Sequence, residues 1–295
     1  MLLESFIDYL SLEKKYALHT VKAYQNDLKT FQKFLKQQCD VHDLKEVDYT
    51  QIRSWIVYLV GKEITNRSIN RKISSLHTFY KYLLKIEEIT INPLSKHKAL
   101  KVAKKLQIPF SQREIEHALE DFNFDQTFEG VRDKLIIEMF YSTGIRRIEL
   151  VQLKLSDVDF SKKNIKVLGK RNKERYLPLL DGVLKSIEEY LKWRKAILVN
   201  KNSTNLFLTK KGDDIYETLV YRIINTYFSK ASTKVKKSPH ILRHSFATHL
   251  LNQGADLNAV KELLGHASLA ATQIYTHNSI GELKNVYVKS HPRSK

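Results

Sequence analysis

The stretch Asn164–Leu179 decides the fold class of this chain of 295 residues, and it reads Asn-Ile-Lys-Val-Leu-Gly-Lys-Arg-Asn-Lys-Glu-Arg-Tyr-Leu-Pro-Leu. Its two ends, Asn164–Leu168 and Arg175–Leu179, read as two short strands. A glycine followed by polar and charged residues separates them, which predicts a turn at Gly169–Glu174. We therefore expect a short hairpin, and with it a small sheet.

Most of the remaining sequence carries apolar residues at helical spacing. In the first half we expect helices at 2–14, 18–38, 50–60 and 66–86. A capping box at Ser111–Glu114 opens the helices of the second half. Those that follow it are expected at 130–142, 182–198, 216–230, 241–252, 257–264, 268–275 and 280–289. The predicted fold class is mainly α with a small β-sheet (α+β).

The junction between the two halves contains Pro93, which stops a helix, and the polar basic run Ser95–Lys98. We place a linker at 92–108. Residues 1–91 are then expected to form an N-terminal helical bundle, and residues 109–295 a larger second domain.

The charge balance limits the kind of partner. Lys and Arg number 50 against 32 Asp and Glu, a formal charge of +18, which favours nucleic acid or an anionic membrane over a small metabolite. The single cysteine, Cys39, excludes a disulfide framework, and no motif for a metal, nucleotide or other cofactor is present. No signal peptide is recognisable, and the longest apolar run, Trp55–Val60, is too short to span a membrane. A cytoplasmic protein is expected.

Two helices of the first half each present a polar face that offers cations, amides and hydroxyls without an acid. Phosphates and base edges accept such donors, so we predict DNA contacts there. On the second helix these residues are Lys22, Lys29, Lys33 and Lys36. On the fourth helix they are Arg67, Asn70, Arg71, Ser74, Thr78 and Lys81. A solvated surface is the alternative for either face; membrane binding is disfavoured because both helices lack exposed apolar anchors.

Reactive side chains occur in four separate blocks, and none of them is specific alone, since a helical histidine or tyrosine is more often a core or surface residue. In order, the blocks are Thr143-Gly144-Ile145-Arg146-x-x-Glu149-Leu150, Leu168-Gly169-Lys170-x-Asn172-Lys173-Glu174-Arg175, Pro239-His240-x-Leu242-Arg243-His244, and Leu264-Gly265-His266-x-Ser268 with Thr272-x-x-Tyr275. Their combination resembles the tyrosine recombinases of the phage-integrase family, most of all the bacterial Xer site-specific recombinases. The N-terminal signature Thr20-x-x-x-Tyr24-x-x-Asp27-Leu28 extends the resemblance over nearly the whole chain.

The resemblance implies a SAM-like core-binding domain at 1–91 and a catalytic domain at 109–295, which together clamp DNA. Tyr275 would attack the scissile phosphate and form a 3′-phosphotyrosyl link without metal or ATP. Arg146 and Arg243 would hold the nonbridging oxygens, because the guanidinium fork matches phosphate.

Four further residues complete the set that the resemblance implies. Lys170, in the predicted turn, would protonate the departing 5′ oxygen. His240 and His266 would complete the ring of hydrogen-bond donors and help to move protons. Glu149, one turn after the first arginine, would orient the cations.

Two positions depart from the family pattern. Arg147 stands where an aliphatic or small residue is common, which leaves open which adjacent arginine is catalytic; the place of Arg146 directly after Gly144-Ile145 favours Arg146. Arg171 stands where the hairpin commonly has glycine, and we expect Arg171 and Lys173 to contact DNA.

The implied partners are double-stranded DNA with an inverted-repeat site and further protomers. Four protomers, identical or including a second recombinase, would exchange strands through a Holliday junction. The C-terminal helix at 280–289 resembles one that family members dock into a neighbour, and folding back on its own domain is the alternative. The predicted role is resolution of chromosome or plasmid dimers. Integration of a mobile element, type IB topoisomerase activity, or DNA binding without catalysis are the alternatives.

Overall fold

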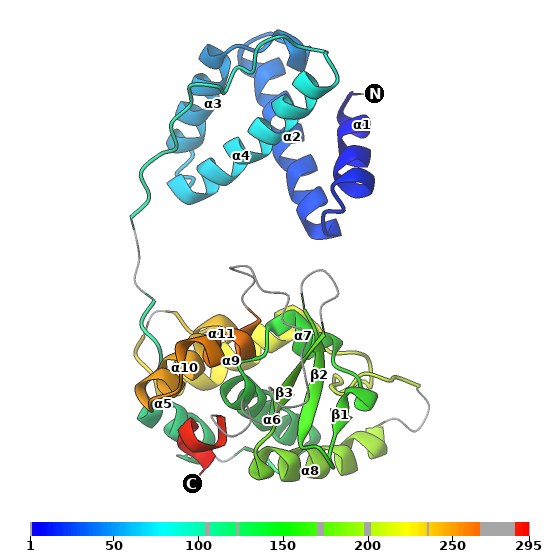
Figure 1. The fold of residues 1–295 in the computed structure, drawn as a ribbon, viewed down its shortest axis with the longest axis vertical. Helices are drawn as coiled ribbons and strands as arrows, with labels where there is room; N and C mark the ends of the chain where they lie inside the picture. The colour runs from blue at the N-terminus through cyan, green and yellow to red at the C-terminus, as the bar shows by residue number, and fades with distance from the viewer. Residues whose placement is uncertain are drawn as a thin grey trace. The chain divides into compact units, whose positions relative to one another are not determined.

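The computed structural model describes residues 2–103, 107–121, 124–169, 174–197, 202–234, 236–265 and 287–294. The chain divides into two compact units, Met1–Lys105 and Leu106–Lys295 (Figure 1). Most of the predicted linker, residues 92–108, belongs to the first unit.

The first unit is a helical bundle. It consists of α1 (Leu2–Asp8), the π-helix η1 (Tyr9–Glu13), α2 (Leu18–Gln38), the short η2 (Leu44–Glu46), α3 (Tyr49–Gly61) and α4 (Asn66–Lys85). The side-chain oxygens of Asp48 and Thr65 cap the first turns of α3 and α4, which fixes where these helices begin. Aromatic rings fill the core, where Phe31 and Trp55 lie 4.8 Å apart between centroids. The four helices predicted in this half are confirmed to within a few residues, the first one being continued by η1.

The second unit surrounds one long buried helix. Its elements before the sheet are α5 (Gln112–Glu116), the π-helix η3 (His117–Asp121), α6 (Phe128–Thr143), α7 (Arg147–Gln152) and η4 (Leu155–Asp157). Those after it are α8 (Asp181–Ile197), α9 (Glu217–Ala231), α10 (Pro239–Asn252), α11 (Leu257–Leu264) and η6 (Pro292–Ser294). Helix α6 is buried around nearly its whole circumference and packs against α8 and α10, so it forms the centre of the core (Figure 1).

The sheet is small and antiparallel, with the strand order β1-β2-β3 in the described part of the chain. The strands are β1 (Val158–Asp159), β2 (Asn164–Leu168) and β3 (Glu174–Pro178). The predicted hairpin strands are confirmed, with Lys166 opposite Tyr176. Strand β1 was not expected, because two residues are too few to show an alternating pattern. The mainly helical α+β class is confirmed.

The described end of the chain, residues 287–294, packs on the second unit itself. Tyr287 and His291 are buried, and the His291 ring lies 5.3 Å from the Tyr141 ring of α6 between centroids. This arrangement is the fold-back alternative for these residues. The rest of the predicted helix at 280–289 and the predicted helix at 268–275 lie outside the described residues. Across the described ranges, no helix combines the length and apolar character needed to cross a membrane.

Candidate active site

The turn between α6 and α7 places Arg146. Helix α6 ends at Gly144, whose φ of +60° lies in the left-handed region. A Cβ at this position would lie 2.5 Å from the ring of Phe246 on α10, so only glycine fits there. The chain then passes through buried Ile145 and brings Arg146 to the N-cap of α7.

Glu149 holds two arginines at once. The backbone N–H of Arg146 donates to Glu149 Oε2 at 2.9 Å, and its Nη1 donates to Oε1 at 2.7 Å. Arg175 of β3 donates to the same two oxygens through Nη1 and Nη2, at 2.7 and 2.8 Å. Burial alone raises the pKa of Glu149, but the bonds and charge of Arg175 and the bonds from Arg146 hold that pKa below its usual value. The carboxylate is therefore ionised at neutral pH.

Arg243 of α10 is a buried cation of the site with a lowered pKa. Its side chain is buried, and its guanidinium donates to the backbone carbonyl oxygens of Gly144 and Leu264. Burial, reinforced by the cations of Arg146 and Arg175, lowers the pKa of Arg243 to about 9. Arg243 is still charged at neutral pH, in a place where an additional anion would stabilise it.

Backbone carbonyl oxygens at the C-terminal end of α11 accept hydrogen bonds from these arginines. Arg146 Nη2 donates to the carbonyl oxygens of Leu264 and Gly265 at 2.9 and 2.6 Å, and Arg175 Nε donates to that of Leu263 at 3.0 Å. Gly265 ends the helix with a φ of +61°. Carbonyl oxygens at a helix C-terminus carry partial negative charge, and a phosphate could accept from the same donors. We call Arg146, Arg175, Arg243 and Glu149 the arginine cluster.

His240 lies at the second position of α10, one turn before Arg243, and it is exposed. Partial burial of the ring and the nearby Arg243 and His244 lower the pKa of His240. The imidazole is therefore mostly neutral at pH 7 and can accept a proton at the rim of the cluster.

The adjacent residues Arg146 and Arg147 bind different partners. Arg147 donates from Nε to Glu217 Oε2 of α9 at 2.7 Å, and 42% of its side chain is exposed. Of the pair, Arg146 therefore lies in the arginine cluster, as favoured from the sequence, whereas Arg147 forms a surface ion pair.

Five predicted site residues lie outside the described part of the chain: Lys170, Arg171, Lys173, His266 and Tyr275. Their neighbours are informative. Gly265, which directly precedes His266, contributes its carbonyl oxygen to the cluster, and β3, which follows the predicted turn, contributes Arg175.

Arg175 received no role from the sequence alone, although a signal was present. In β3, Arg175 and Leu177 are buried while Glu174 and Tyr176 are exposed, which is the alternation of a strand with one face on the core. A cation on the inward face needs buried hydrogen-bond acceptors, and Glu149 supplies two of them.

Most predicted DNA-contacting residues of the first unit are exposed. They are Lys22, Lys29, Lys33 and Lys36 on α2 and Arg67, Arg71, Ser74 and Lys81 on α4, with Thr78 half-buried. These exposures are compatible with the predicted DNA contacts, which remain predictions.

Two residues of the α4 face already have partners. The side-chain amide of Asn70 donates to the carbonyl oxygen of Leu100 at 2.8 Å and accepts from its N–H at 2.9 Å, so Asn70 fastens the predicted linker to α4. Arg71 donates through both Nη atoms to buried Asp27, at 2.5 and 2.8 Å, and half of its side chain stays exposed. Asp27 of the N-terminal signature thus orients a predicted DNA-contacting side chain.

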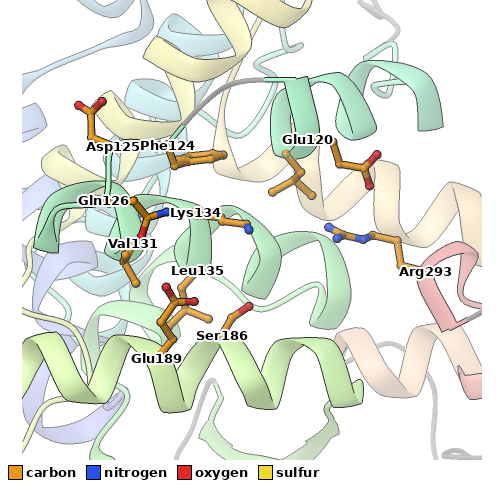
Figure 2. A pocket seen from close by; sticks show the side chains of 11 residues that line it. Glu120, Phe124, Asp125, Gln126, Val131, Lys134, Leu135, Ser186, Glu189 and Arg293 are labelled. Carbon is orange, nitrogen blue, oxygen red and sulfur yellow. The ribbon is translucent and has the colours of Figure 1, made fainter.

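A separate cavity of about 440 Å³ lies between η3, α6 and α8, where Lys134 and Arg293 extend into it (Figure 2). The acids Glu120, Asp125 and Glu189 also line it. None of the predicted site residues lines this cavity.

Comparison with known proteins assigns the family. The phage integrase family matches residues 109–282, and the phage integrase N-terminal SAM-like domain matches residues 3–86. The chain therefore belongs to the phage integrase family, and the resemblance to tyrosine recombinases is confirmed.

Individual relatives are similar over nearly the whole of this chain. The chain is 40% identical over 291 residues to "Tyrosine recombinase XerC" of Staphylococcus haemolyticus (strain JCSC1435), and 41% identical over 293 residues to that of Staphylococcus aureus (strain JH9). Each alignment covers 99% of this chain and 97% of the relative. Among solved structures, the fold is similar to XerH site-specific recombinase bound to palindromic difH substrate, with a TM-score of 0.72, 23% identity, and coverage of 99% of this chain and 81% of that chain.

Proposed function

We propose that the protein is a site-specific tyrosine recombinase of the Xer type, an enzyme that cleaves and rejoins DNA strands through a 3′-phosphotyrosyl intermediate and a Holliday junction. The observation that carries this proposal is the convergence of Arg146, Arg175 and Arg243 on Glu149 and the end of α11. The full-length similarity to tyrosine recombinases named XerC supports the Xer type.

The charge of the arginine cluster suits a phosphodiester. Three guanidinium charges and one carboxylate charge leave +2 on these four side chains, and burial, with the repulsion from Arg146 and Arg175 added, lowers the pKa of Arg243. A bound phosphodiester brings one negative charge, and attack on phosphorus adds a second in the transition state. The cluster therefore stabilises the transition state more than the bound substrate.

The reaction needs a nucleophile and an acid beside this cluster. Tyr275 attacks the scissile phosphorus, its phenolic proton is removed, and the bond to the 5′ oxygen breaks. Lys170 gives its proton to that departing oxygen. His240, neutral at pH 7, accepts the phenolic proton of Tyr275, and His266 completes the ring of donors. Rejoining is the reverse reaction, so neither ATP nor a metal ion is required.

Arg146 and Arg243 hold the nonbridging oxygens. In the described state both donate to the carbonyl oxygen of Leu264, so the phosphate takes over donors that already point to a common centre. Glu149 keeps Arg146 in place through its backbone N–H and its guanidinium.

Recognition of the DNA site belongs to both units in this proposal. The exposed cations of α2 and α4 contact phosphates and base edges, and Arg171 and Lys173 add contacts beside the cleavage site. Four protomers assemble on two inverted-repeat sites, either as one protein or with a second recombinase. The role is resolution of chromosome or plasmid dimers in the cytoplasm.

Trapping on nicked suicide duplexes tests the reaction class. The protein is incubated with a pool of palindromic duplexes in EDTA and without ATP, and the products are separated after denaturation. We expect a covalent DNA–protein adduct that survives denaturation. Tight binding without an adduct would contradict the proposal and favour a DNA-binding relative without catalysis.

A further inference from the structure

We propose that Arg175 is a positioning residue for strand cleavage. Its side chain ties the motifs of Arg146, Lys170 and His266 into one rigid unit around the scissile phosphate. This inference rests on the proposed recombinase function and adds a residue whose role that function does not include. Arg175 lies on β3, whereas its partners lie on α7 and at the end of α11.

The contacts of Arg175 are those of a fixed connector. Its Nη1 and Nη2 form two parallel bonds to the carboxylate of Glu149, and its Nε reaches the carbonyl oxygen of Leu263 at 3.0 Å. Only 7% of its side chain is exposed, against 2% for Glu149, so water does not compete for these bonds. Three directed bonds from one planar group fix its orientation.

Through Glu149, the position of Arg175 determines the position of Arg146, the proposed phosphate-binding arginine. Each of its oxygens accepts two bonds, one from Arg175 and one from Arg146. Without Arg175 the buried carboxylate keeps only the two bonds from Arg146. Arg146 must then neutralise a buried anion alone, and its guanidinium is drawn away from the phosphate.

The other bond of Arg175 acts on the approach to His266. Leu263 is the next-to-last residue of α11, and Gly265 separates the helix from His266. A Cβ at Gly265 would lie 3.2 Å from the Arg175 side chain, so the end of the helix packs directly on this arginine. Arg175 thereby fixes the point from which the chain continues to His266.

Arg175 also anchors the strand that follows the predicted turn. Val167 of β2 pairs with Arg175, and Leu168 pairs with Glu174, so residues 170–173 connect two strands whose register is set beside Arg175. The turn carries Lys170, the proposed acid. One side chain of β3, the strand after the predicted turn, therefore joins α7, which begins beside Arg146, to the end of α11 before His266.

Lysine cannot replace this arginine, because an ammonium group cannot form two parallel bonds to a carboxylate and a third to a carbonyl. We therefore compare Arg175→Ala and Arg175→Lys with the wild-type protein in full-length form. Arg194→Ala is the matched control. Arg194 is equally buried and donates to the carbonyl oxygens of Ser203, Asn205 and Leu206, but it lies outside the arginine cluster.

The measurements are the rate of covalent adduct formation on the suicide duplex, the Kd for the same duplex, and the thermal unfolding curve. For both Arg175 variants we expect cleavage to fall roughly 100-fold, as a displacement of about 1 Å at a reacting centre produces, with Kd changed less than about 3-fold. Arg194→Ala should lower the unfolding temperature and keep the wild-type cleavage rate per folded molecule. Cleavage by Arg175→Ala that falls only with its folded fraction would overturn the proposal.

Chemical rescue separates positioning from a general loss of stability. Guanidinium ion at millimolar concentrations, far below the denaturing range, can enter the space left in Arg175→Ala and pair with Glu149. We expect it to restore part of the cleavage rate of that variant and to leave Arg194→Ala unchanged. Equal effects on the two variants, or none on Arg175→Ala, would contradict the inference. An adduct from wild-type protein establishes the recombinase reaction independently of these results, so the two proposals fail separately.

Coupling to Glu149 gives a last check. In the Glu149→Gln background the carboxylate is gone, so the additional change Arg175→Ala should slow cleavage by less than about 5-fold, because residues in one network are not additive. If Arg175→Ala still slows cleavage about 100-fold in the Glu149→Gln background, Arg175 acts independently of Glu149, and the proposed action through Glu149 is overturned.

Discussion

Arg146 and Arg243 donate hydrogen bonds to the same carbonyl oxygen, that of Leu264 at the end of α11. Two segments far apart in the sequence are thus aligned on one acceptor before any phosphate is bound. Binding of the scissile phosphate requires these donors to turn from the carbonyl to the phosphate oxygens. We expect these two side chains to turn while Arg175 keeps the end of α11 in place through Leu263.

Removing one of these two guanidinium groups should affect DNA cleavage far more than DNA binding. For Arg243→Ala we expect adduct formation to fall about 100- to 1,000-fold, the range found when one donor to a transition-state oxygen is lost. The Kd should change only a few-fold, because many other phosphate contacts remain. Single-turnover cleavage and a gel-shift titration measure the two quantities. Equal losses in both would make Arg243 a phosphate anchor with no special role in the transition state.

The adjacent arginines provide a matched pair. Arg146→Ala should lose cleavage to the same extent as the Arg243 variant, whereas Arg147→Ala should stay within about 3-fold of wild type. Arg147 contributes a surface ion pair with Glu217, and such pairs are worth about 0.2–1 kcal/mol. The suicide-duplex assay on both variants decides the assignment. A severe defect in Arg147→Ala would exchange the roles of the two residues.

The basic face of α2 should determine much of the salt dependence of DNA binding. Each lost phosphate contact reduces the slope of log K against log salt by about 0.9, so Lys29→Ala combined with Lys33→Ala should reduce it by roughly 2. The exposed pair Lys185 and Lys192 of α8 is the charge-matched control, and replacing it should leave the slope unchanged. If the two double variants behave alike, α2 does not face the DNA.

Docking of the C-terminal residues should weaken in acid. Burial lowers the pKa of His291 to about 4; the hydrogen bond to the backbone of Tyr141 opposes this shift, and Arg293 and His249 add smaller lowering effects. The neutral ring accepts the backbone N–H of Arg293 at 3.1 Å and pairs with the carbonyl oxygen of Tyr141 at 3.2 Å, which places its proton on Nε2. A lowered pKa means that the undocked tail binds a proton more readily than the docked tail. Docking is therefore strongest above about pH 6.5 and is lost progressively as the pH falls toward 4.

An NMR titration of the imidazole nitrogens measures this directly. We expect His291 to titrate well below 6.5 in the full-length protein. In Tyr287→Ala, which removes the ring packed 5.3 Å from His291, the pKa should move back toward 6.5. A pKa near 6.5 in the unmodified protein would show that the tail is not docked in solution.

Much of the fold followed from local patterns. Capping residues and apolar periodicity located the helices, and two short strand-like segments on either side of a polar turn located the hairpin. The sequence could not locate β1, because its two residues owe their conformation to pairing with β2 and not to their own pattern. The candidate site shows the same division.

The motifs indicated candidate site residues but not the contacts of those residues. Arg175 was overlooked because its role depends on a carboxylate of another element, Glu149, and on a helix end that approaches only in the folded domain. Asn70 was assigned to DNA from the composition of its helix face, whereas its amide bonds the predicted linker. Tertiary contacts of this kind leave no local periodic signal.

The attachment point of the DNA tests the central claim most directly. Wild-type protein and Tyr275→Phe are incubated with the same suicide duplex in EDTA, and the adduct is digested and mapped by mass spectrometry. We predict that the wild-type adduct carries the nucleotide on the peptide that contains Tyr275, and that Tyr275→Phe binds the duplex with a similar Kd and forms no adduct. An adduct on another residue, or one that persists in Tyr275→Phe, would contradict the account.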